Sequence, residues 1–115
     1  MYYYIQCFIS FNERMFIMAS KHIPPEDVHS PKLHWSLIKV LADKGPGEYS
    51  VALGKWDNDP VIAMRWNGTE KSPIGNPQSR GLPTWFVVPG NYQDAILEQI
   101  SKDMMSFVNK FFEKT

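Results

Sequence analysis

Two apolar segments separated by a very short polar turn constrain the fold of this chain more than any other feature. Residues 48–56 and 60–66 carry apolar side chains at alternate positions, and only the polar residues 57–59 lie between them. Alternation is typical of strands with one buried face, and a tight polar turn joins antiparallel neighbours. The pattern predicts a β-hairpin, in which Gly54 marks a bulge or a close approach by another backbone. The core-facing side chains should be Tyr49, Val51, Leu53, Ile62, Met64 and Trp66.

The sequence after the hairpin predicts one more strand and a helix. Residues 84–88 are nearly all apolar, which is typical of a strand that is covered on both faces. Residues 91–114 repeat apolar side chains at helical spacing. The apolar stripe of this C-terminal helix is wider than one small sheet needs to cover. Either the N-terminal segment or a second subunit should share this stripe, and we expect a homodimer that packs through the C-terminal helix.

Residues 31–44 have two interpretations, and both give an α+β fold. Ser30-Pro31 is a typical helix start, Gly45 supplies a stop, and the apolar residues between them recur at helical spacing. A helix here gives an antiparallel three-stranded sheet with two helices, in the order α-β-β-β-α, both able to lie on one face. The alternative is a strand, which gives four strands plus a C-terminal helix. The residues that suit a strand are Trp35, Ile38 and Val40.

The length of 115 residues predicts a single domain. We expect residues 30–115 to form it and residues 1–29 to be an N-terminal segment with a proline-rich linker. Met-Ala-Ser-Lys at residues 18–21 is typical of a bacterial start, so our hypothesis is that residues 1–17 precede the natural start. The alternative is an extra strand or short helix over residues 2–9. The apolar run is shorter than the roughly 18 residues that span a bilayer, so no membrane partner is expected.

Charge and cysteine content restrict the partners and the compartment. The formal net charge is zero and the basic residues are scattered singly, whereas binding to phosphate backbones needs a clustered basic face. Nucleic-acid binding is therefore disfavoured. The single cysteine, Cys7, excludes an internal disulfide and favours a reducing compartment, the cytoplasm.

The connection over residues 67–83 is the candidate recognition loop. It exceeds the roughly 12–15 residues beyond which a structureless loop is usually functional or disordered, and its glycines and prolines restrict its path. One interpretation is a groove for a small anionic or planar ligand, since amides, cations and aromatic rings lie close together. The alternative is a self-packed loop with Arg80 paired to a carboxylate. The candidate binding residues are Arg65, Trp66, Asn67, Asn76, Gln78, Arg80 and Trp85.

The sequence contains no pattern that indicates catalysis. His22, His29 and His34 lack metal-ligand spacing, and Cys7 has no evident activating partner. The glycines at residues 45–47 lack the lysine and helix of a phosphate-binding loop. We therefore predict no catalytic residues, no metal and no cofactor, and the enzyme class stays uncertain.

Three segments carry a family resemblance. They are Met64-Arg65-Trp66-Asn67-Gly68, Gly75-Asn76-Pro77-Gln78-Ser79-Arg80-Gly81 and Pro83-Thr84-Trp85-Phe86-Val87-Val88-Pro89. Over roughly residues 30–89 the chain resembles a family of small bacterial proteins of unknown function, some carried on integron gene cassettes. The resemblance implies a bacterial cytoplasmic source and transfers no catalytic residues.

Three functional hypotheses follow from these patterns. The first is a small cytoplasmic binding or interaction protein, homodimeric, with its recognition surface at the 67–83 loop. The second is a single-stranded nucleic-acid-binding protein, because four strands plus a helix is similar to the PC4-like fold and tryptophans can stack bases. The third is an accessory or antitoxin-like factor that binds another protein. The order of elements also matches double-stranded RNA-binding domains, but the acidic start of the C-terminal helix disfavours phosphate.

Overall fold

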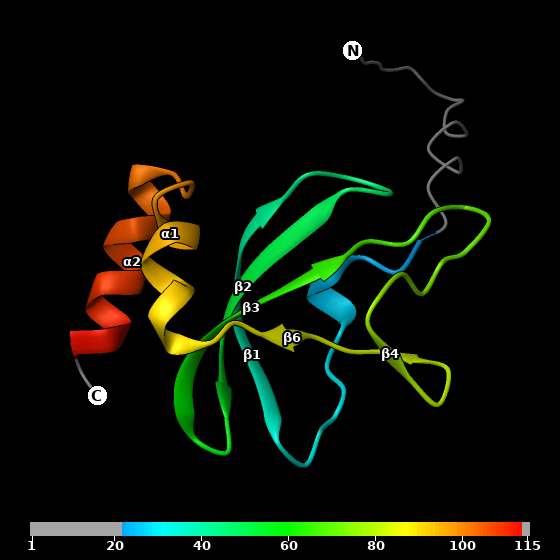
Figure 1. Cartoon of the computed structure of the whole chain (residues 1–115), viewed down its shortest axis with the longest axis horizontal. Coiled ribbons are helices and arrows are strands. Elements are labelled where there is room, and N and C mark those ends of the chain that lie inside the picture. Colours follow the sequence, from blue (N-terminus) through cyan, green and yellow to red (C-terminus); the bar gives the residue numbers. More distant parts are fainter. Residues whose placement is uncertain (1–21, 114–115) are drawn as a thin grey trace, which may run out of the picture.

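A computed structural model describes residues 22–113 and has an α+β fold, as expected from the sequence (Figure 1). Four strands form an antiparallel sheet in the order β1-β2-β3-β6, and β4 and β5 form a separate short hairpin. The strands are β1 (Trp35–Asp43), β2 (Tyr49–Trp56), β3 (Asp59–Trp66), β4 (Gln78–Ser79), β5 (Leu82–Pro83) and β6 (Phe86–Val87). The helices are α1 (Gln93–Leu97) and α2 (Lys102–Glu113), with short 3-10 helices η2 (Pro25–Asp27) and η3 (Gly90–Tyr92).

The expected β2–β3 hairpin is confirmed. Trp56 pairs with Asp59, so only Asp57 and Asn58 form the turn. Both turn residues have positive φ, 50° and 75°, which is the backbone of a type I′ turn. Asp and Asn tolerate this conformation better than other side chains, which explains the polar residues at this position.

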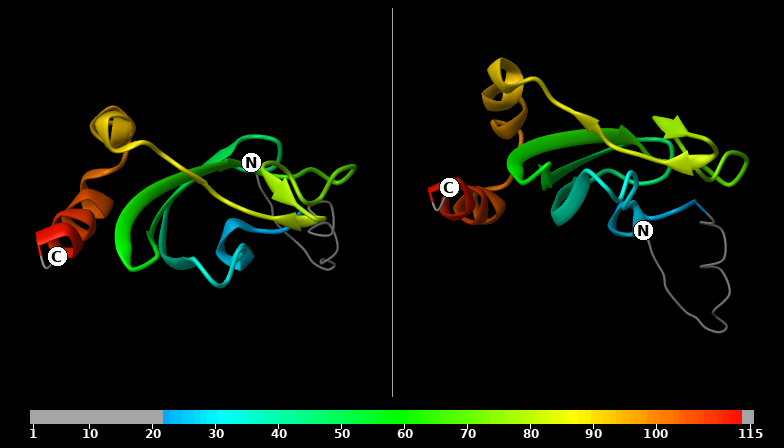
Figure 2. Two further views of the ribbon diagram at one scale, coloured as in Figure 1. Left: turned by 60° about the horizontal axis from the view of Figure 1, so that its bottom comes forward. Right: turned by 90° about the horizontal axis from the view of Figure 1, so that it is seen from below.

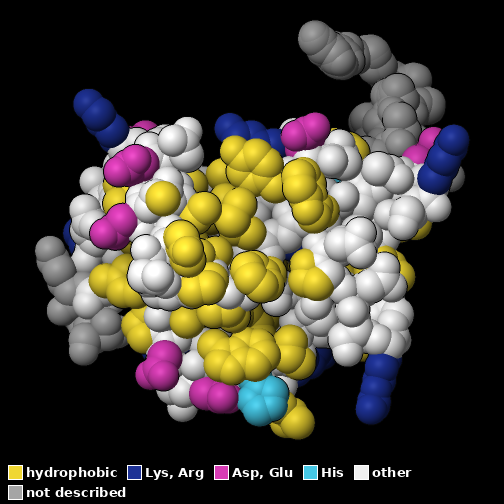
Figure 3. Space-filling view, in the orientation of Figure 1, with side chains coloured by type: hydrophobic (Ala, Val, Ile, Leu, Met, Phe, Trp, Pro, Cys, Tyr) yellow, Lys and Arg dark blue, Asp and Glu magenta, His cyan; other side chains and the backbone are white. Residues whose placement is uncertain are grey.

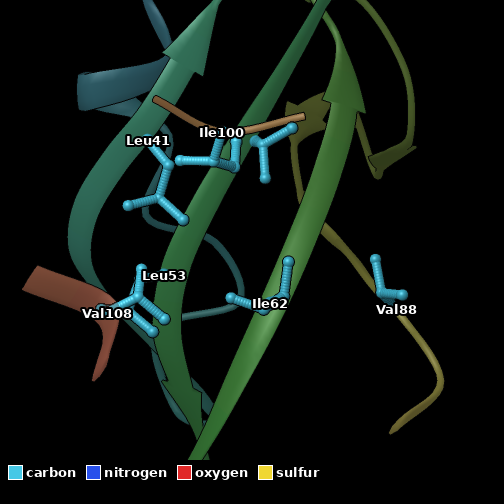
Figure 4. Packing of buried hydrophobic residues seen from close by; sticks show 7 residues of the cluster. Leu41, Leu53, Ile62, Val88, Ile100 and Val108 are labelled. Atoms are coloured by element: carbon cyan, nitrogen blue, oxygen red, sulfur yellow. The ribbon is translucent and has the colours of Figure 1, made fainter. Parts of the chain in front are cut away.

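The main core lies between the sheet and the C-terminal helices. Val51 and Leu53 of β2 and Ile62 of β3 are buried there, as expected from their alternation. In Figure 4, Val108 of α2 and Ile100 of the turn before α2 lie beside the buried side chains of the strands. The remaining buried members of this core are Leu41, Val88, Ile100 and Val108. Trp66, which was expected in the core, is exposed because the helices do not reach the end of β3 where it lies.

The helix expected over residues 31–44 is wrong, and the four-stranded alternative is correct. Pro31 does begin a helical turn, since the Trp35 backbone N–H donates to the Pro31 carbonyl, but β1 follows at once. Two register shifts interrupt the pairing of β1 with β2, between Leu37 and Lys39 and between Val40 and Ala42. Each bulge adds a residue and breaks the period of two. The resulting spacing of apolar residues imitates a helix.

A second core covers the other face of the sheet and includes residues before the expected domain start. Trp85 donates its indole N–H to the Val28 carbonyl over 2.8 Å, and Val28 is fully buried. Trp35 packs on Trp85 with ring centroids 5.8 Å apart. Packing therefore begins before Ser30, in the segment expected to be a linker. The buried members are Val28, Trp35, Ala52, Ala63 and Trp85.

Gly54 is a site of close approach, as expected. A Cβ atom at Gly54 would lie 2.3 Å from the Trp35 ring and 2.7 Å from the Ser36 carbonyl oxygen. Only glycine leaves space for the Trp35 ring across the β1–β2 pair.

The C-terminal segment forms two helices instead of the single helix expected over residues 91–114. The Gln99 and Ile100 backbone N–H groups donate to carbonyls three residues earlier, which tightens and ends α1. Ser101 then accepts a hydrogen bond from the Met104 backbone N–H over 3.4 Å, as an N-cap does. The apolar side chains keep their helical spacing across this break, so the spacing did not indicate the N-cap at Ser101.

The molecule has two distinct ends. Figure 2 shows α1 and α2 at one end and the β4–β5 hairpin at the other. No helix within residues 22–113 has the length and apolar character needed to cross a membrane. The hypotheses on residues 1–17 and 2–9, and Cys7, lie outside the described residues.

Candidate functional site

The loop over residues 67–83 contains two ordered parts. Residues 67–75 turn back toward β3, where Asn76 pairs with Trp66 through hydrogen bonds of 2.7 and 3.0 Å in both directions. The chain then leaves the sheet as the β4–β5 hairpin, closed by a 3.0 Å hydrogen bond from the Thr84 N–H to the Pro77 carbonyl. It returns at Phe86, which pairs with Met64. The hairpin is thus an excursion from one interrupted edge strand.

Arg65 fixes the first part of this loop from inside. It is 3% exposed, and its guanidinium donates hydrogen bonds to the carbonyls of Ile74 and Thr84. Burial lowers the pKa of Arg65 from its ordinary value. Gly75 allows the close approach, since a Cβ there would lie 2.3 Å from the Trp66 carbonyl oxygen. Two guanidinium nitrogens of Arg65 are therefore bound to the backbone, and the third, Nε, is buried without a hydrogen-bond partner among the described residues.

Asn67 also lies inside the protein. Its amide donates to the Asp43 carboxylate over 3.0 Å and to the Gly45 carbonyl over 2.9 Å. Its side-chain oxygen accepts a 2.8 Å hydrogen bond from Ser50, which is fully buried. Asn67 therefore joins the β1–β2 connection to the end of β3, and it is not a surface recognition residue.

The other candidate residues do not converge on one point. Gln78 donates to the Gly75 carbonyl over 3.1 Å. Arg80 is exposed at the tip of the β4–β5 hairpin, in a turn where Arg80 and Gly81 have φ of 53° and 79°. Within residues 22–113 Arg80 has no ion pair, so the expected carboxylate partner is not found there. Trp85 is buried in the second core.

Three candidates, Arg65, Trp66 and Asn76, do line a common cavity of about 590 Å³. We call this cavity the aromatic hollow; it lies on the sheet between the helices and the 67–83 loop. Trp66 and Phe86 are each 57% exposed beside it, and Figure 3 shows hydrophobic side chains gathered on this face. Its lining residues are Tyr49, Met64, Arg65, Trp66, Asn76, Pro77 and Phe86.

Sequence analysis missed four lining residues of the aromatic hollow. Tyr49 and Met64 were assigned to the core, and they do pack partly against it. The face of the sheet that carries Tyr49 and Met64 continues beyond the helices. The outer parts of these two side chains line the hollow there. Phe86 carried a signal, because its alternation with Val87 predicts that one of them faces away from the covered side. Pro77 carried none.

A second cavity, of about 480 Å³, adjoins the first. Pro77 and Phe86 line both cavities. Among the described residues that line the second cavity, Asp59 is the one with a charged side chain. Trp56, also in the lining, stacks on His34 at 5.2 Å, and His34 Nδ1 lies 2.7 Å from the Asp57 carboxylate. We call this cavity the acidic hollow, lined by Trp56, Asp59, Val61, Pro77, Thr84, Trp85, Phe86 and Val87.

A metal centre is not evident in the part of the chain that the structure describes, where no three His, Cys, Asp or Glu side chains gather. The lining of the aromatic hollow offers aromatic faces and a few hydrogen-bonding groups.

Comparison of the chain with protein-family models, with curated proteins and with solved structures found no match in any of the three. The resemblance to bacterial integron-cassette proteins stays a prediction.

Proposed function

We propose that this protein is a binding protein and that the aromatic hollow is its recognition surface. The observation that carries this proposal is the exposure of two large aromatic side chains, Trp66 and Phe86, beside a cavity of about 590 Å³. Exposed apolar patches that line a concavity are typical of ligand or partner sites, and the volume lies within the usual range for such sites. The 67–83 loop contributes Asn76 and Pro77 to this surface.

The lining favours an uncharged group with a flat or apolar surface. Arg65 is the charged residue among the described residues of the lining, and its guanidinium is already bound by two carbonyls. Among the described lining residues, an anionic ligand would therefore find no cation that is both exposed and free of these hydrogen bonds. Besides the buried Nε of Arg65, three polar groups of the lining make no side-chain hydrogen bond within residues 22–113: the Tyr49 hydroxyl, the Trp66 indole N–H and the Asn76 amide. These groups can orient a ligand.

Titration of the ¹⁵N-labelled full chain with indole, followed by NMR, tests this proposal. We expect shift changes at the Trp66 indole N–H and at the backbone of Met64 and Phe86. Trp66→Ala and Phe86→Ala should each weaken binding by at least about fivefold, as truncation of a central aromatic contact does. The control is Tyr92→Ala, because Tyr92 is 61% exposed but does not line the hollow. Equal affinity in all three variants would reject the aromatic hollow as the site.

We also propose that the protein forms a homodimer through α2. Phe107 of α2 is 40% exposed, although Lys39 lies over its ring at 5.9 Å. A second copy that covered Phe107 would remove this apolar surface from water. Light scattering of the wild type and of Phe107→Ser should give a dimer and a monomer, respectively. A monomeric wild type at high concentration would contradict the proposal.

The setting that we propose is the bacterial cytoplasm, supported by the single cysteine and by the family resemblance. A protein partner suits the exposed apolar surface better than a nucleic acid does, since phosphates need free cations and the described lining offers only Arg65, which is buried and bound to two carbonyls. An accessory or antitoxin-like role is one form that a protein partner would take.

A further inference from the structure

The two hollows adjoin at the edge strand β6, the aromatic hollow on the face that the helices cover and the acidic hollow on the face of the second core, and we call them together the groove. Pro77 and Phe86 line both, so the two cavities meet at these residues. Trp66 lines the aromatic hollow and Trp56 lines the acidic hollow. A ligand that extends across Phe86 would therefore contact aromatic rings on both sides.

The sheet edge beside this groove is β6, which at two residues offers few backbone groups, and β3 behind it is already paired. Trp66 exchanges hydrogen bonds with Asn76, Met64 pairs with Phe86, and the Val88 N–H donates to the Ile62 carbonyl over 2.8 Å. An added β-strand needs free backbone groups at a sheet edge. A polyproline II segment does not, because it has no backbone ladder and its apolar rings lie on aromatic faces.

The free polar groups of the groove match what a proline-rich segment offers. Proline has a carbonyl acceptor and no N–H donor. The Trp66 indole N–H and the Asn76 amide are donors without a side-chain hydrogen bond among the described residues. They are therefore suited to donate hydrogen bonds to the carbonyls of such a segment.

The acidic hollow adds a charge preference. Asp59 is exposed at the start of β3 and lines this cavity next to Trp56. A carboxylate beside an aromatic ring suits an arginine or lysine, which gains an ion pair and an aromatic contact. The same carboxylate repels a phosphate or an acidic peptide.

From these observations we propose that the groove binds a proline-rich peptide in the polyproline II conformation, with a basic residue seated in the acidic hollow. This inference rests on the proposed function, because the prolines would occupy the aromatic hollow. It names the partner as a peptide segment of another protein, uncharged along most of its length and basic at one end.

The test uses the full chain and blocked synthetic peptides of eight prolines. One set carries an arginine at either end in separate peptides, since the direction of the bound chain is open, and a matched set carries glutamine instead. We expect the arginine peptides to bind with shift changes at Trp66, Phe86 and Trp56. Trp66→Ala should weaken both sets by about tenfold, as loss of a central aromatic anchor does.

Asp59→Asn separates the charge contribution from the aromatic one. We expect it to weaken the better arginine peptide by about twofold to fivefold, the range of an exposed ion pair, and to leave the glutamine peptides unchanged. The control is Glu70→Gln, because Glu70 is exposed in the 67–75 part of the loop and lines neither hollow.

The outcomes separate the two proposals. If indole binds the aromatic hollow and no proline peptide binds, the peptide inference is overturned and the proposed function stands. If neither indole nor peptide binds, both fall. Peptide binding that is unaffected by Trp66→Ala overturns the groove, and equal effects of Asp59→Asn on arginine and glutamine peptides overturn the basic position.

Discussion

At the scale of single residues, Arg65 shows how a cation can stabilise a loop without contacting a ligand. Its guanidinium donates to two carbonyls, that of Ile74 within the 67–83 connection and that of Thr84 directly after it. A lysine at this position has no planar fork, so it can replace one of these hydrogen bonds and leaves the other carbonyl unsatisfied. We expect Arg65→Lys to lower the free energy of unfolding by about 1.5–3 kcal/mol, measured by urea denaturation.

The matched control for Arg65→Lys is Arg80→Lys. Arg80 is exposed at the hairpin tip and has no ion pair with a described residue, so the change should stay within about 0.5 kcal/mol. Equal midpoints of unfolding for both variants would mean that the two carbonyl contacts contribute nothing to stability.

The sequence predicts which residues surround the site better than it predicts their orientation. Arg65, Trp66 and Asn76 do line the aromatic hollow, but Arg65 is buried with its guanidinium bound to carbonyls. Asn67, on the other side of Trp66, points into the protein. Cations and amides bind ligands and backbone carbonyls with the same chemistry. The path of residues 67–76 decides between these partners, and that path depends on tertiary contacts at Gly75 that no local pattern encodes.

Gly54 gives a second prediction at this scale. A methyl group there would overlap the Trp35 ring and the Ser36 carbonyl. We expect Gly54→Ala to destabilise the protein by about 1–3 kcal/mol, the usual cost of overpacking a core. Gly90→Ala is the control, since a Cβ at Gly90 meets nothing within 4 Å. Thermal unfolding at one pH compares them, and a Gly54→Ala variant as stable as Gly90→Ala would argue against tight packing of Trp35.

At the scale of elements, local patterns predict the regular hairpin and fail where the chain is irregular. The β2–β3 hairpin keeps a period of two and a turn of suitable residues, so its prediction is confirmed. In β1, Trp35 and Leu37 pack in the second core whereas Leu41 packs in the first, because bulges rotate the strand between them. A strand that changes face has no single period. Its assignment therefore required the partner strand.

Helix α2 stabilises the sheet mainly through Val108, which is 1% exposed and packs with Leu53 and Ile62 in the main core. Val108→Ala removes two buried carbon atoms and leaves a small cavity. We expect a loss of roughly 1.5–3 kcal/mol in the free energy of unfolding. Asn109→Ala, at an exposed position of the same helix, should change it by less than about 0.5 kcal/mol. If the two variants unfold at the same urea concentration, α2 does not dock as described.

At the scale of the whole molecule, the aromatic hollow exists because the helices cover only part of one face of the sheet. Ile96 and Ile100 cover the face as far as Tyr49 and Met64, where a gap of about 100 Å³ remains, and Trp66 lies beyond it. The α+β class could be predicted from the sequence, because it depends only on the presence of both an antiparallel sheet and helices. The extent of the uncovered face depends on where α1 ends. The helical spacing of apolar residues did not indicate that end.

The exposed aromatic side chains raise the question of nucleic-acid binding, and a separate experiment tests it. Stacked bases need aromatic faces, which Trp66 and Phe86 offer, but their phosphates also need free cations nearby. Arg65 is bound by carbonyls, Asp59 is acidic, and the chain has a formal net charge of zero. We expect no quenching of tryptophan fluorescence when a mixed-sequence single-stranded oligonucleotide is added at low salt. Quenching that weakens as salt rises and disappears in Trp66→Ala would restore the PC4-like alternative. A proline-rich peptide, in contrast, should change the fluorescence at both low and moderate salt, because aromatic contacts are insensitive to ionic screening.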